Sequence, residues 1–277
     1  MIHLTIQNKK IPVLGFGTWQ LKGKECLAGV EKALEVGYRH IDTAQIYENE
    51  AEVGAAIKAS GVKREDIFLT TKVWITELKD GPLQKSVEVS LKKLKVDHVD
   101  LLLIHWPVNE VPFAEQLRAL QSVQAAGKTA LIGVSNYTVA QMKEVVEKIG
   151  AKIVTNQVEY HPYLSQKPIL DYLKAHGLFL TAYSPLARGR VNDDLVLKKI
   201  ALKYNKTPGQ ITLRWLVMQK GVVAIPKAAS EKHIRENFEI FDFMLNAEEM
   251  NAITALARPD GRIVNPDNIA PVWDKTG

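Results

Sequence analysis

Residues 37–61, GYRHIDTAQIYENEAEVGAAIKASG, contain one strand-and-helix unit. The unit begins with a short apolar run, RHIDTA (39–44), in which Asp42 stands near the end. It continues into NEAEVGAAIKASG (49–61), where apolar residues recur at spacings of three and four, which predicts an amphipathic helix. The final glycine is typical of a helix C-terminus.

The same alternation of apolar run and helical pattern continues through nearly the whole chain. Eight runs predict strands, at residues 13–18, 39–44, 67–73, 99–106, 130–136, 153–160, 178–185 and 221–227. Strands that alternate with helices predict a parallel sheet with crossover helices. Because no linker or change in composition divides the chain, we expect one domain over residues 1–277, a closed (β/α)8 TIM barrel, rather than two doubly wound domains. The opening IHLTIQNKKIPV predicts an N-terminal β-hairpin cap with its turn at Asn8-Lys9.

The composition excludes several classes of protein. With 277 residues, 46% hydrophobic and 24% charged, the chain resembles an ordinary globular protein. The net charge of +5 is spread among interleaved acidic residues, which favours a solvated surface or a small phosphorylated cofactor over nucleic acid. A single cysteine, Cys26, permits no intramolecular disulfide and is expected in the core. No signal peptide or membrane-spanning run is recognisable, so we expect a cytoplasmic protein.

Polar and titratable residues gather at the predicted strand ends, where barrels carry their reactive groups. Asp42, Lys72 and His105 end the second, third and fourth predicted strands, and Tyr47 follows the second. A buried Asp–Lys pair is costly to desolvate, so an effect on a neighbouring group explains it better than stability does. A cation beside a phenol favours the phenolate, so we expect Lys72 to lower the pKa of Tyr47 and make it a better acid.

This combination suits the protonation of a carbonyl oxygen as it becomes an alcohol. His105 is predicted to donate to that oxygen or to orient it, and the hydride must come from a cofactor. Each residue also has an uneventful explanation: Asp42 as a turn or helix-start residue, and His105 as a core histidine. A buried Lys72 is harder to explain in that way, and the placement of all four at one barrel end favours catalysis.

The motifs GFGTW, GYRHIDTAQIYENEAEVG, LTTKVW, LLLIHWP, IGVSNY, NQVEYHPYL, TAYSPLARG and AIPKAAS occur in this order between about residues 4 and 240. Together they closely resemble the aldo-keto reductase family. The tail GRIVNPDNIAPVWD and the short loops resemble the bacterial 2,5-diketo-D-gluconate reductases of the B type. The resemblance implies a catalytic tetrad of Asp42, Tyr47, Lys72 and His105, with Tyr47 as the general acid.

The resemblance also implies the binding residues. A nicotinamide cofactor is expected to contact Asp42, Ser135, Asn136, Gln157, Tyr183, Ser184, Leu186, Lys227, Ser230, His233, Glu236 and Asn237. Tyr183 corresponds to the residue that stacks on the nicotinamide. Ser184, Leu186 and Lys227 correspond to positions that line the pyrophosphate and the 2′-phosphate. Substrate is expected to contact Trp19, Tyr47, Trp74, His105, Trp106 and Trp273, although the tryptophans are equally explained by packing. No metal is expected, and His161 is assigned to structure.

One departure from the family concerns the cofactor. Many members carry Lys-Ser and then an arginine facing the 2′-phosphate, whereas this chain has Lys227-Ala228 and His233. A neutral imidazole binds phosphate less well than guanidinium, but Lys227 is retained, so NADPH is expected and NADH is the alternative.

The predicted function is the NADPH-dependent reduction of aldehydes and ketones. The expected substrates are small polar carbonyls such as keto-sugar acids, 2,5-diketo-D-gluconate or methylglyoxal, and we expect a monomer. The alternative is a non-catalytic barrel that binds the nicotinamide cofactor as a sensor or partner subunit. A nucleic-acid binder would need a basic stripe with interleaved aromatic residues, which the sequence lacks.

Overall fold

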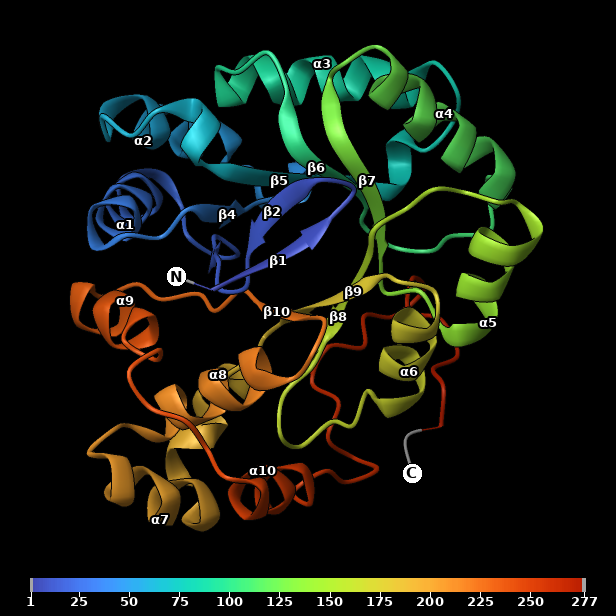
Figure 1. Cartoon of the computed structure of the whole chain (residues 1–277). Coiled ribbons are helices and arrows are strands. Elements are labelled where there is room, and N and C mark those ends of the chain that lie inside the picture. Colours follow the sequence, from blue (N-terminus) through green and yellow to red (C-terminus); the bar gives the residue numbers. More distant parts are fainter. Residues whose placement is uncertain (1, 276–277) are drawn as a thin grey trace.

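Eight parallel strands form one sheet that follows chain order in the computed structural model, which describes residues 2–275 (Figure 1). The strands are β3 (Phe16–Gly17), β4 (His40–Asp42), β5 (Phe68–Val73), β6 (Val99–Ile104), β7 (Thr129–Ser135), β8 (Thr155–Glu159), β9 (Phe179–Tyr183) and β10 (Val222–Ala224). The first and last strands also meet, because Leu14 bridges to Ala224 and the N–H of Gly15 donates to the Ala224 carbonyl at 2.8 Å. The predicted (β/α)8 barrel is therefore confirmed.

Helices surround the strands in a ring (Figure 1). They are α1 (Gly23–Val36), α2 (Glu50–Ala59), α3 (Pro82–Leu94), α4 (Phe113–Ala125), α5 (Val139–Lys143), α6 (Lys167–Ala175), α7 (Leu195–Tyr204), α8 (Pro208–Met218), α9 (Glu231–Phe238) and α10 (Ala247–Thr254). Local signals set several of their ends. Gly37, with φ of 120°, ends α1, and the Thr207 side chain caps α8 by accepting from the N–H of Gln210.

Two expectations about element bounds need correction, and one helix changes its geometry along its length. Helix α5 ends at Lys143 and continues directly as a π-helical turn, Glu144–Lys148. The first and last barrel strands are also shorter than the apolar runs that predicted them. The hairpin turn lies at Gln7-Asn8, not at Asn8-Lys9. A two-residue turn of this kind needs positive φ at both positions, and Gln7 and Asn8 have φ of 46° and 61°.

The hairpin closes one end of the barrel. Its strands β1 (His3–Ile6) and β2 (Lys9–Pro12) pair antiparallel, and they cross the middle of the ring of helices in Figure 1. Ile11 is fully buried and packs with inward-facing residues such as Leu101, Leu131 and Val223. Because this plug fills the N-terminal end, the cavity at the C-terminal end is the one that can admit a ligand.

The barrel is surrounded by a continuous apolar core in which the sequence-predicted core residues lie. Cys26 is fully buried, and burial raises its pKa to about 12, so it is an inert core thiol. Trp215 is 2% exposed and its indole N–H donates to Thr254 at 3.1 Å. Within the described chain, no helix is long and apolar enough to cross a membrane.

Candidate active site

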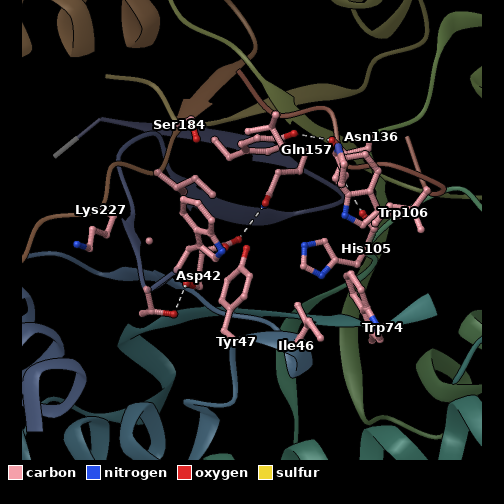
Figure 2. Close-up of a pocket in the computed structure, with 18 residues that line it drawn as sticks. Asp42, Ile46, Tyr47, Trp74, His105, Trp106, Asn136, Gln157, Ser184 and Lys227 are labelled. Atoms are coloured by element: carbon pink, nitrogen blue, oxygen red, sulfur yellow. Dashed lines mark hydrogen bonds between the residues drawn. The ribbon is translucent and has the colours of Figure 1, made fainter. Parts of the chain in front are cut away.

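A cavity of about 270 Å³ opens at the C-terminal ends of the barrel strands (Figure 2). Most of the residues predicted to be functional line it. Its walls are formed by Gly17, Thr18, Trp19, Asp42, Ile46, Tyr47, Trp74, His105, Trp106, Asn136, Gln157, Tyr183, Ser184, Ile225, Lys227, Val264, Pro266 and Ile269. Lys72 does not line the cavity but lies directly beneath Asp42 and Tyr47, within contact of both.

An ion pair is buried at the floor of the cavity. Lys72 is fully buried and donates to the Asp42 carboxylate at 2.5 Å and to the Thr43 carbonyl at 2.9 Å. The other carboxylate oxygen of Asp42 accepts from the Gln157 amide at 2.8 Å. Burial lowers the pKa of Lys72, while Asp42 opposes that shift. Asp42 therefore holds the ammonium in one place, and a third N–H of Lys72 is left for the Tyr47 hydroxyl.

Tyr47 lies next to this pair, at the end of the short 3-10 helix η1 (Gln45–Tyr47) that follows β4. The Lys72 ammonium donates to the phenol oxygen at 3.4 Å and lies 4.9 Å from the centroid of the ring. The loop is fixed from outside, because the Lys22 ammonium donates to the Tyr47 carbonyl at 2.7 Å. Figure 2 shows the hydroxyl pointing toward Asp42.

The expected lowering of the Tyr47 pKa is wrong for this structure. The pKa of Tyr47 is raised well above its ordinary value, first by burial and then by the negative charge of Asp42. A low-dielectric environment penalises the phenolate more than the nearby ammonium favours it, since that ammonium is already paired with a carboxylate. Tyr47 is consequently fully protonated at neutral pH, which is the state that a proton donor requires.

His105 completes the group on the opposite wall. It follows β6, and its ring packs edge-on between Tyr47 and Trp74, with centroids 5.6 and 5.3 Å away. Burial lowers the pKa of His105 well below its ordinary value, and the Lys72 charge adds to that shift. The imidazole is therefore neutral at working pH and carries one N–H. Among residues 2–275, its buried Nδ1 has no hydrogen-bond partner.

Side-chain amides connect the catalytic wall to the rest of the cavity. Asn136, in a left-handed conformation with φ of 67°, donates to the His105 carbonyl at 3.0 Å and accepts from the Tyr183 hydroxyl at 2.8 Å. Gln157 faces Asp42, as described above. Ser135 lies outside the cavity and its hydroxyl donates to the Gln157 carbonyl at 2.8 Å. These contacts bring a flat ring and two amides together beside Tyr47.

The end of the cavity away from His105 carries polar and charged side chains. Figure 2 shows Ser184 and Lys227 on the side away from Trp74 and Trp106. Lys227 forms no ion pair with any residue from 2 to 275. The remaining predicted cofactor residues lie outside the cavity walls: Leu186 on the loop after β9, and Ser230, His233, Glu236 and Asn237 on α9 or at its start. Ser230 caps α9 by accepting from the N–H of His233.

The end of the cavity near His105 is apolar. Figure 2 shows Trp74, Trp106 and Ile46 on this side. Three tail residues that the sequence did not identify, Val264, Pro266 and Ile269, also line the cavity. Trp19 lines the cavity and lies 5.2 Å from the Arg188 guanidinium. Trp273 does not reach the cavity wall. It packs against Trp106 at 6.1 Å, and the Arg262 guanidinium lies 3.6 Å from its ring.

A buried carboxylate fixes the tail in this position. Glu159, at the end of β8, is fully buried and accepts from the backbone N–H groups of Ile263 at 2.7 Å and Val264 at 2.9 Å. It also contacts His161 at 2.9 Å, which gives that histidine the structural role expected from the sequence. No cluster of residues suited to a metal ion occurs in the described part of the chain.

Comparisons with known proteins agree with this geometry. A model of the aldo/keto reductase family matches residues 13–258. A methylglyoxal reductase, DkgB, of Salmonella typhi is 45% identical over 267 residues, which cover 95% of this chain and 99% of that protein. A glyoxal reductase of Bacillus subtilis is 43% identical over 261 residues, 94% of each chain.

A solved structure is closer still in sequence. The crystal structure of "a putative 2,5-diketo-D-gluconic acid reductase B" is 50% identical, covers 99% of this chain and 98% of its own, and superimposes with a TM-score of 0.96. The family predicted from the motifs is confirmed, and so is the resemblance of the chain to a B-type reductase. The chain is thus a carbonyl-reducing oxidoreductase that uses a nicotinamide cofactor, and it belongs to the aldo-keto reductase family.

Proposed function

We propose that the chain reduces small aldehydes and ketones with NADPH, and that Asp42, Tyr47, Lys72 and His105 are its catalytic residues. One observation carries the proposal: the Lys72 ammonium, fully buried and held by Asp42, lies 3.4 Å from the Tyr47 hydroxyl at the floor of the cavity. A buried pair of this kind is a poor device for stability but an effective one for acting on a neighbouring acid.

The cavity fits a nicotinamide cofactor in its donor chemistry. Tyr183 offers a flat ring, Asn136 and Gln157 offer amides, and Lys227 offers a cation that no carboxylate neutralises among residues 2–275. These residues would hold the nicotinamide at one end and a phosphate at the other. Ser135, Ser184, Leu186, Ser230, His233, Glu236 and Asn237 are proposed as further cofactor contacts. When bound, the cofactor supplies the hydride.

The chain's own residues then handle the proton and the substrate oxygen. Tyr47 holds its proton at the phenol oxygen and gives it to the carbonyl oxygen as that oxygen gains negative charge. Lys72 stabilises the phenolate that forms, and Asp42 keeps the ammonium within reach. His105, as a neutral imidazole, donates one hydrogen bond that orients the carbonyl. Trp74 and Trp106 exclude water from this end of the cavity.

The wall near His105 bears on the choice of substrate. Its side chains Ile46, Trp74 and Trp106 carry no charge, and Lys227 lies at the other end. A substrate carboxylate packed against these three side chains would lose its hydration and meet no cation among them. We propose uncharged carbonyls such as methylglyoxal as better substrates than keto-sugar acids such as 2,5-diketo-D-gluconate. Methylglyoxal appears in the name of one relative, and 2,5-diketo-D-gluconic acid in the name of another.

The direct test follows NADPH absorbance with methylglyoxal for the wild-type protein and for Tyr47→Phe. We expect the substitution to lower kcat by about 10²- to 10⁴-fold, the usual contribution of a positioned acid, with the dissociation constant for NADPH unchanged. Undiminished turnover in Tyr47→Phe would remove Tyr47 from its assigned role. Cofactor binding without turnover of any carbonyl in a broad panel would instead favour the non-catalytic barrel.

The preference for NADPH over NADH rests on Lys227 and needs its own test. His233 is exposed on α9, at the position where many family members carry an arginine that faces the 2′-phosphate. If it faces that group, His233→Arg should tighten NADPH binding by roughly 1–2 kcal/mol through a charge-assisted hydrogen bond, and leave NADH binding unchanged. Equal dissociation constants for wild type and variant with both cofactors would contradict the assignment.

A monomeric state, a cytoplasmic location and a single domain over residues 1–277 stay predictions from the sequence. Gel filtration of the purified chain tests the first, cell fractionation tests the second, and a single cooperative unfolding transition tests the third.

A further inference from the structure

Asn49 lies between Tyr47 and α2, at a point where three chain segments meet. Its side chain is fully buried. The amide nitrogen donates to the Thr18 carbonyl at 2.8 Å and the Leu21 carbonyl at 2.9 Å, and the amide oxygen accepts from the Thr43 hydroxyl at 2.7 Å. Both donors and an acceptor of the amide are thus satisfied.

This bonding is unusual for the position. Asn49 stands at the N-cap of α2, where an asparagine side chain normally accepts from a backbone N–H of the first turn. Here it makes no such bond. The side chain is instead directed away from its own helix and toward the loop that follows β3, so its role concerns the loops rather than the stability of α2.

The segments that Asn49 connects each carry a part of the site. Thr18 and Leu21 flank Trp19 of the cavity wall, and Thr18 donates to the Asp42 carbonyl through both its N–H and its hydroxyl, at 3.0 Å each. Thr43 follows Asp42, and its carbonyl is the second acceptor for the Lys72 ammonium. A shift of Asn49 would therefore reach Tyr47 by the chain and Lys72 through Thr43.

We propose that Asn49 is a positioning residue that sets the distance between the Tyr47 hydroxyl and the Lys72 ammonium. The inference rests on the proposed function of those two residues. Position 49 needs a side chain that donates to two carbonyl oxygens and accepts from one hydroxyl, within a fully enclosed space. Asparagine meets that requirement, whereas aspartate has the same shape and only acceptors.

The test therefore uses Asn49→Asp, which keeps the side-chain volume. It replaces the amide NH2, which donates to two carbonyl oxygens, with an oxygen that can only accept. We expect kcat for methylglyoxal reduction to fall about 100-fold, the effect of a small misplacement of reacting groups. The dissociation constant for NADPH should change less than about twofold, because Gln157 and Tyr183 lie on β8 and β9, and Lys227 follows β10. Hydrogen exchange should speed up in residues 18–22 and 43–49.

Thr155→Val serves as the matched control. Thr155, the first residue of β8, is fully buried, and its hydroxyl donates to the Phe179 carbonyl at 2.8 Å. The variant therefore also loses a buried hydrogen bond. It should lower the melting temperature without changing kcat. Should Asn49→Asp fail to fold, Thr43→Val removes the hydroxyl that orients the amide, and about a tenfold loss of kcat is expected there.

The outcomes separate this inference from the proposed function. A kcat that stays within about threefold of wild type in a folded Asn49→Asp or Thr43→Val protein would overturn the positioning role. So would an equal loss of kcat in Thr155→Val. If the wild type reduces no carbonyl, the proposed function fails, but hydrogen exchange in residues 18–22 and 43–49 still decides whether Asn49 fixes the two loops.

Discussion

Replacing Lys72 with methionine removes the ammonium and keeps an unbranched side chain of similar length. The ammonium lies 3.4 Å from the Tyr47 oxygen. At that distance a cation and a full phenolate charge interact by about 5 kcal/mol, for an effective dielectric constant of about 20. With the proton about half transferred, roughly 2.4 kcal/mol of this would be lost from the transition state. That corresponds to a fall in kcat of about 60-fold, at 1.36 kcal/mol for each factor of ten.

The same substitution affects folding, because Asp42 is only 2% exposed. Without Lys72 its carboxylate keeps the Gln157 amide but no opposite charge. Leaving one partner of a buried ion pair uncompensated costs about 3–5 kcal/mol. The double variant Lys72→Met with Asp42→Asn removes both charges. It should recover part of the free energy of unfolding but none of the rate, since the ammonium is still missing.

The assay is therefore a pair of measurements on three proteins. Chemical denaturation gives the free energy of unfolding, and NADPH consumption with methylglyoxal gives kcat, each for wild type, Lys72→Met and the double variant. Recovery of stability without recovery of kcat is the expected pattern. A single variant with kcat near the wild-type value, or a double variant in which rate returns together with stability, would refute the electrostatic argument.

Two further predictions concern pH and the tail. Burial lowers the pKa of His105 and of His40, so the unfolded chain binds protons below about pH 6.5 that the folded chain does not. Stability should therefore fall as the pH drops below that value, by at most about 1.4 kcal/mol per pH unit for each histidine, and His105→Gln should reduce the slope in denaturation series at several pH values. An unchanged slope would place His105 in water. Glu159→Gln puts an amide N–H against a backbone N–H of the tail. A hydrogen bond to a charged group is worth about 1.5 kcal/mol, so the KM for methylglyoxal should rise about tenfold. The affinity for NADPH should stay constant. Steady-state kinetics with an unaltered KM would show that the tail does not form the substrate wall.

The sequence predicts the barrel and the strand-end residues because both depend on local patterns. Short apolar runs alternate with regular helical spacing, and consecutive strands joined by crossover helices usually lie side by side. The order of strands in the sheet therefore follows their order in the chain. Asp42 and Lys72 end neighbouring strands, so that their contact follows from topology alone. Capping signals such as Thr207 are equally local.

The contacts of the tail carry no such signal. Glu159 accepts from the backbone of Ile263 and Val264, more than a hundred residues later in the chain, and backbone donors leave no mark on residue identity. Nothing in the pattern of the tail therefore points to Glu159. Trp273 was expected to contact the substrate from the family resemblance, but it packs against Trp106 and does not line the cavity.

The pKa of Tyr47 shows a second kind of limit, and it also resolves the apparent conflict with its role. Neighbouring charges can be inferred from sequence, but the exclusion of water cannot, and here burial outweighs the ammonium. A donor must be protonated before it reacts, so a high resting pKa does not oppose the role of Tyr47. The burial that raises this pKa also lowers the local dielectric constant, which strengthens the attraction of Lys72 for the phenolate as it forms. The contribution of Lys72 should therefore appear in the barrier to proton transfer rather than in the titration of the resting enzyme, and a spectroscopic pKa of Tyr47 alone would not measure it.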